Sequence, residues 1–158
     1  MRGSGVRYRA VLIVWLAFVS AAAPAASNAV YDATCALCHQ AAGAGLKGQF
    51  PRLAGRVDRI AASAQGREFL IQTLVHGMAG RIEVDGAATV GVMPSFVSLS
   101  DADLASVLNY LISLGGKAAK RIKPITATEI AAVRKAPRLS AAQVLEHRTA
   151  LVAAGHVP

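Results

Sequence analysis

The 158-residue sequence holds only two cysteines, and both lie in one short stretch. A structural zinc site of the usual kind needs a second pair of ligands, and His76, His147 and His156 are widely scattered. A thioredoxin-like use of a Cys-x-x-Cys pair calls for a βαβ context, yet no strand-rich run follows these cysteines. The sequence therefore disfavours both a zinc site and a thioredoxin-like redox motif.

Aromatic residues make up only 5% of the chain, so a hydrophobic core has to be built mainly from Leu, Val, Ile and Ala. The length suggests one domain with an appendage.

Basic residues outnumber acidic ones by 17 to 9, and such an excess is common in proteins that bind nucleic acid or an anionic membrane. The basic residues are dispersed and form no run of the nucleic-acid-binding type, so we expect no nucleic-acid partner.

Residues 1–29 have the organisation of a secretory signal peptide. Arg2, Arg7 and Arg9 precede an apolar run at 10–19, and small residues with several candidate cleavage points follow at 20–29. The apolar run is too short to predict a transmembrane helix. We therefore expect an exported, periplasmic protein, with membrane contact only if the leader is retained as an anchor.

Residues 35–39 read Cys-Ala-Leu-Cys-His, which places two thiols three positions apart and an imidazole directly after them. This spacing is typical of a c-type haem attachment site. On one helical turn the two sulfurs can each reach one vinyl group of a haem, while the adjacent histidine turns a ring nitrogen to the iron. The stretch predicts one covalently bound haem c per chain, attached through Cys35 and Cys38 and ligated by His39.

A haem held by one histidine needs its other axial position accounted for. Met78 and Met93 are the methionines beyond the initiator, and a thioether suits a low-spin haem iron and raises its reduction potential. Pro94 restrains the backbone after Met93, which stands in a loop before a long helix, whereas Met78 directly follows a helix. The sequence favours Met93 over Met78 as the second ligand, with core packing as the alternative role of either methionine.

Apolar periodicity and capping residues predict helices and little else. Ser100 is placed as an N-cap, and Gly77 and Gly115 as helix ends. We expect helices near residues 30–40, 67–76, 100–114, 127–136 and 141–154, and a compact irregular segment at 78–92. The predicted fold class is all-α, with a main domain at 30–116 and a short helical extension at 117–158.

Four motifs in this order resemble class I cytochromes c, the small all-helical monohaem electron carriers. They are Cys35–His39, Phe50–Gly55, Gly91–Pro94 and Leu99–Leu111. The resemblance implies thioethers from Cys35 and Cys38 and iron ligation by His39 and Met93. It also implies that the Pro51 carbonyl accepts a hydrogen bond from His39, and that Tyr110 and Leu111 lie near the crossing of the first and last family helices.

The resemblance implies one-electron transfer between redox partner proteins, such as a periplasmic dehydrogenase, reductase or terminal oxidase, and not enzymatic catalysis. Residues 82–86 look like those of a subset that serves dehydrogenases and respiratory enzymes. Two alternatives stay open. A labile Met93 would leave an iron site for peroxide or nitric oxide chemistry, and the extension at 117–158 would be a docking arm for a larger oxidoreductase.

Overall fold

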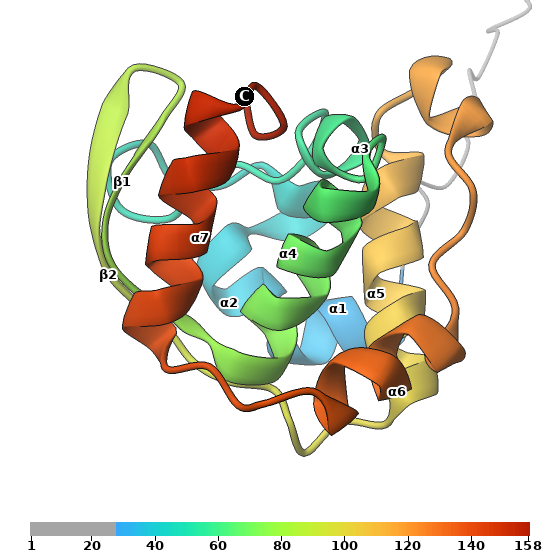
Figure 1. The fold of residues 1–158 in the computed structure, drawn as a ribbon. Coiled ribbons are helices and arrows are strands. Elements are labelled where there is room, and N and C mark those ends of the chain that lie inside the picture. Colours follow the sequence, from blue (N-terminus) through green and yellow to red (C-terminus); the bar gives the residue numbers. More distant parts are fainter. Residues whose placement is uncertain (1–27) are drawn as a thin grey trace, which may run out of the picture.

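The computed structural model describes residues 28–158, so the predicted leader lies almost wholly outside the described residues. Helices pack around a shared core, and one β-hairpin forms a side wall (Figure 1). The α-helices are α1 (Ala29–Thr34), α2 (Ala36–His39), α3 (Val57–Ile60), α4 (Ala64–His76), α5 (Asp101–Ser113), α6 (Ala127–Lys135) and α7 (Ala141–Ala153). Two 3₁₀ turns, η1 (Ala41–Gly43) and η2 (Ala118–Arg121), and two strands, β1 (Met78–Val84) and β2 (Ala87–Met93), complete them. None of the described helices has the length and apolar character needed to cross a membrane.

The helix predicted at 30–40 is two short helices, because the chain breaks at Cys35 between α1 and α2. Asn28 caps α1 by accepting a hydrogen bond from the Tyr31 amide. The ring of Tyr31 is fully buried and packs on Tyr110 of α5, with ring centroids 5.1 Å apart. The prediction that Tyr110 lies at the contact between the first helix and the long later helix is confirmed.

The two long central helices begin at capping serines and bury an aliphatic core. Ser100 accepts from the Asp103 amide at the start of α5, as predicted. Ser63 accepts from the Gly66 amide at the start of α4, which begins at Ala64, three residues before the predicted start of this helix. Gly77 ends α4 with a φ of 76°, a conformation that glycine adopts without strain. Most of the buried core is aliphatic, as the low aromatic content requires.

The prediction of an irregular segment at 78–92 is wrong. β1 and β2 pair antiparallel in register from Met78↔Met93 to Val84↔Ala87. The two-residue loop between them is Asp85-Gly86, with φ values of 53° and 69°, as a type I′ hairpin turn requires. The fold is therefore mostly helical with one small sheet, and the all-α prediction holds only for the rest of the described chain.

The C-terminal extension packs back onto the protein. Both of its α-helices begin with the predicted capping boxes. Arg67 of α4 forms an ion pair with Glu129 of α6 at 2.8 Å, and Arg134 of α6 pairs with Asp101 of α5 at 2.5 Å. Helix α7 runs along β1 and α4 (Figure 1). The boundary near residue 116 stays a prediction.

Candidate haem-binding site

A cavity of about 270 Å³ lies between the first helices and the hairpin. All five residues predicted for the site, Cys35, Cys38, His39, Pro51 and Met93, line it. The other lining residues are Thr34, Leu37, Gln49, Phe50, Met78, Gly80, Ile82, Thr89, Gly91, Val92, Pro94 and Phe96. The structure thus brings together residues that are far apart in the sequence.

His39 is held in a defined orientation. Its side chain is buried, and its Nδ1 lies 2.9 Å from the carbonyl oxygen of Pro51. Because a carbonyl oxygen only accepts hydrogen bonds, Nδ1 carries the proton and Nε2 keeps the lone pair. Burial lowers the pKa of His39, although the Pro51 contact opposes that shift. The neutral imidazole therefore offers one nitrogen to a metal ion.

A tightly folded loop presents the Pro51 carbonyl to His39. The Gly43 carbonyl accepts hydrogen bonds from the Leu53 and Ala54 amides at 2.8 and 3.1 Å, which closes the loop at its base. Gly45 has a φ of 70°, and a Cβ there would lie 2.5 Å from the Arg52 backbone nitrogen. The glycines in this stretch therefore permit the close approach that brings the loop against α2.

The two thiols are free and lie within one turn of each other. Cys35 is buried, and desolvation by burial raises the pKa of its thiol. Cys38 is half-buried, and both side chains line the cavity. Leu37, between them, is 88% exposed and stands at the rim. This arrangement leaves two sulfurs available to one ligand in the cavity.

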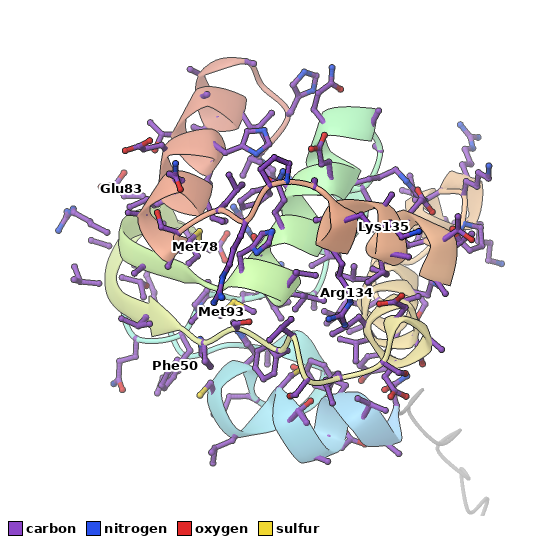
Figure 2. The ribbon with its side chains drawn as sticks, turned by 60° about the horizontal axis from the view of Figure 1, so that its bottom comes forward. Phe50, Met78, Glu83, Met93, Arg134 and Lys135 are labelled. Atoms are coloured by element: carbon purple, nitrogen blue, oxygen red, sulfur yellow. The ribbon has the colours of Figure 1, made fainter. Side chains whose placement is uncertain are left out.

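The hairpin supplies the facing wall through alternating residues. Met78, Gly80 and Ile82 of β1 line the cavity, and so do their cross-strand partners, which are Met93, Gly91 and Thr89. Alternate residues of a strand point to the same face, and paired residues on two strands share that face. Figure 2 shows Met78 and Met93 at the same end of the hairpin.

The backbone after Met93 is fastened to the end of α4. Ser95 Oγ donates to the Val75 carbonyl at 2.6 Å, and the Phe96 amide donates to the Leu74 carbonyl at 2.8 Å. A Cβ at Gly77 would lie 2.6 Å from the Met93 carbonyl oxygen, so the two segments touch. The support that we expected from Pro94 alone comes largely from these contacts.

The sequence does not show that Met78 lies at the site. It places Met78 directly after a helix without structural support, whereas in the structure Met78 begins β1 and pairs with Met93. The hairpin residues Ile82 and Thr89 were missed as cavity residues altogether. The Asp85-Gly86 pair carried the available signal, because this dipeptide between β-prone runs favours a two-residue hairpin.

The donor set fits a c-type haem. The cavity offers two free thiols, an imidazole nitrogen with its lone pair and thioether sulfurs within a mostly apolar lining. Among residues 28–158, no group of three or more His, Cys, Asp or Glu side chains is placed to hold a metal ion by itself. Thiols form the covalent attachment in a c-type haem site, and imidazole and thioether groups are its usual axial ligands.

An ion-pair group joins the Pro51 loop to the hairpin turn. Arg52 contacts Asp85 at 2.8 Å and Arg56 contacts the same carboxylate at 3.3 Å. The hydrogen bond from Arg52 holds the pKa of Asp85 below its usual range. These contacts connect the two walls of the cavity at one end.

Comparison with known proteins agrees with the site. The family model described as Cytochrome c matches residues 24–115. Two relatives, both named cytochrome c-552 and both from Thermus thermophilus, are similar over most of their length. One is 43% identical over 142 residues, covering 89% of this chain and 95% of the relative. The other is 45% identical over 128 residues, covering 80% of this chain and 97% of the relative. The chain therefore belongs to the cytochrome c family, and it is an electron-transfer protein that carries covalently bound haem c and not an enzyme.

Proposed function

We propose that this cytochrome carries single electrons between redox partners in the periplasm, with its haem iron ligated by His39 and Met93. The observation that carries the proposal is the placement of these two side chains on separate walls of one cavity. His39 has its Nδ1 committed to Pro51, which leaves Nε2 for the iron. Met93 is held on the hairpin by the contacts of Ser95 and Phe96 with α4.

The haem, when bound, supplies a one-electron couple between ferric and ferrous iron. The protein side chains attach it, orient it and keep water away. Cys35 and Cys38 form the thioethers, and Pro51 fixes the histidine tautomer, as second-shell partners of metal ligands do. Apolar lining residues such as Phe50 and Ile82 lower the local polarity. A haem iron bound by both His39 and Met93 would offer no open site to a substrate.

The rim of the cavity suits contact with a partner protein. Leu37 and Val92 line the cavity and are 88% and 74% exposed. Exposed apolar side chains that gather in one place are typical of interaction sites. We propose that a dehydrogenase, reductase or terminal oxidase docks here. The resemblance of residues 82–86 to the dehydrogenase-associated subset stays a prediction.

The decisive experiment is expression of the full chain with a working haem maturation apparatus. We expect one haem per chain in a pyridine haemochrome assay, recovery in the periplasmic fraction, and low-spin six-coordinate spectra in both oxidation states. A colourless protein with two free thiols contradicts the proposal. Persistent high-spin iron and rapid carbon monoxide binding favour the alternative of a labile Met93.

A further inference from the structure

The hairpin wall presents two thioether side chains to the cavity. Met78 is the first residue of β1 and Met93 the last residue of β2, and the two are direct partners in the antiparallel register. Both are half-buried and both line the cavity (Figure 2). A haem ligated by His39 needs only one of these sulfurs.

The pairing places the two methionines within reach of the same point. Side chains directly opposite each other in an antiparallel pair have Cβ atoms about 4.5–5.5 Å apart and point to the same face. Methionine is unbranched and has three rotatable bonds, so its sulfur explores several ångströms. The two sulfurs are chemically equal as soft ligands.

The two positions differ in their backbone support. Met93 is followed by Ser95 and Phe96, which are hydrogen-bonded to the last turn of α4. Met78 follows Gly77, whose backbone lies against Met93, Pro94 and Ser95. Under the proposed function Met93 is the resident ligand, because the residues after it are hydrogen-bonded to α4, and Met78 lies beside it on the same wall.

We propose that Met78 is a reserve axial ligand, whose Sδ binds the haem iron when Met93 leaves it. The inference rests on the proposed His39 and Met93 ligation and deepens it. In the exchange the Met93 sulfur–iron bond breaks and the Met78 sulfur–iron bond forms, while the oxidation state of the iron and all protons stay where they are. The exchange keeps the iron six-coordinate and closed to small ligands.

The experiment compares three holoprotein variants with the wild type, which are Met93→Ala, Met78→Leu and the double variant Met78→Leu/Met93→Ala. The readouts are the thioether-to-iron charge-transfer band of the ferric protein and the upfield-shifted methyl protons of a ligating methionine in the ferrous protein. We expect Met93→Ala to keep both signals, the double variant to lose both, and Met78→Leu to match the wild type. Leucine conserves the volume of methionine, so Met78→Leu is a matched control for packing.

The remaining outcomes separate this inference from the function on which it rests. If Met93→Ala loses both signals as completely as the double variant, the inference is wrong while Met93 ligation stands. If Met78→Leu alone loses them, Met78 is the resident ligand, and both the inference and the assignment of Met93 are overturned. A wild-type protein without these signals contradicts the proposed ligation itself. Should Met93→Ala fail to load haem, Met93→Thr, which suits a strand position, takes its place.

Discussion

The two walls of the haem cavity are built in different ways. On the helical wall, Cys35, Cys38 and His39 lie within one local stretch, and a single loop carbonyl orients the imidazole. On the hairpin wall, Met78 begins β1 and Met93 ends β2, and the two meet only because the strands pair. The first wall is specified by neighbouring residues, and the second by tertiary contacts.

This difference predicts two kinds of sensitivity. Changes on the helical wall remove the covalent bonds or His39, whose imidazole is the one that residues 28–158 place in the cavity, so they are expected to decide whether the protein holds the haem. Changes on the hairpin wall act on which sulfur is bound and how firmly, because the attachment lies elsewhere. The helical wall is therefore expected to determine attachment, and the hairpin wall to tune the spectrum and the potential.

The largest effect is expected from Cys35→Ala combined with Cys38→Ala. Both sulfurs available for thioethers are then gone, so no haem stays with the chain on a denaturing gel stained for haem. Leu37→Ala is the matched control, because Leu37 lies between the cysteines and is 88% exposed. Covalent haem in the double variant, or its loss from the control, contradicts the assignment of the helical wall.

Replacing Met93 by His tests the hairpin wall directly. An imidazole in place of the proposed thioether ligand removes the group that raises the potential, so we expect the reduction potential to fall, within the span of about 0.8 V that axial ligands cover. Covalent attachment stays complete in a pyridine haemochrome assay. Potentiometric titration measures the fall, with Val90→Thr as control because Val90 is exposed on the same strand. In the Met78→Leu background, where Met78 cannot replace it, an unchanged potential argues that Met93 is not the ligand.

The sequence was sufficient to predict those features that depend on residues close together in the chain. The Cys-x-x-Cys-His spacing, the serine cap of α5 and the capping boxes of α6 and α7 each depend on residues within one turn of one another, and the structure has each helix cap where it was expected. The hydrogen bond between His39 and Pro51 was expected from the family resemblance alone, and it is present.

The sequence was not sufficient to predict contacts between strands or between distant segments. The run from Met78 to Met93 contains Gly80, Gly86 and Gly91, which weakened the strand signal, and only the Asp85-Gly86 turn marked a hairpin. Met78 gained its place at the site from that pairing. Helix α7 packs on β1, where Leu145 lies so close to Gly80 that a Cβ there would be 2.4 Å from its side chain. No local pattern predicts such a contact.

A smaller effect is expected from Tyr31→Phe, which weakens the support behind the helical wall. The Tyr31 hydroxyl donates to the Gln40 carbonyl at 2.7 Å, directly after His39, and the side chain is fully buried. Leaving that carbonyl without its partner costs about 1–3 kcal/mol of the free energy of unfolding. Chemical denaturation of the ferric protein at neutral pH measures it. Tyr110→Phe is the matched control, since Tyr110 shares the same ring contact. An equal loss of unfolding free energy in both variants argues against a role for the hydrogen bond to Gln40.

The same variant carries a pH test. Burial raises the pKa of Tyr31 from 10.0 to about 12 in the folded protein. The unfolded chain releases this proton first as pH rises, so the stabilisation is complete below pH 10.0 and is lost up to about pH 12. The stability difference between the wild type and Tyr31→Phe is therefore expected to shrink across that interval. A difference that stays constant from neutral pH to pH 12 contradicts the raised pKa.

The smallest effect is expected from Ser95→Ala, which loosens the hairpin wall without touching a ligand. Ser95 Oγ donates to the Val75 carbonyl at 2.6 Å and accepts from the Val97 amide at 3.2 Å. Loss of one such contact costs about 0.5–1.5 kcal/mol. In the Met78→Leu background, where no second thioether can take over, we expect the thioether-to-iron band to disappear at a lower denaturant concentration than the helical circular dichroism. The exposed Ser98→Ala control in the same background loses both together. Coincident transitions in Ser95→Ala would show that Met93 does not depend on this attachment to α4, because its ligation would then fail only when the whole protein unfolds.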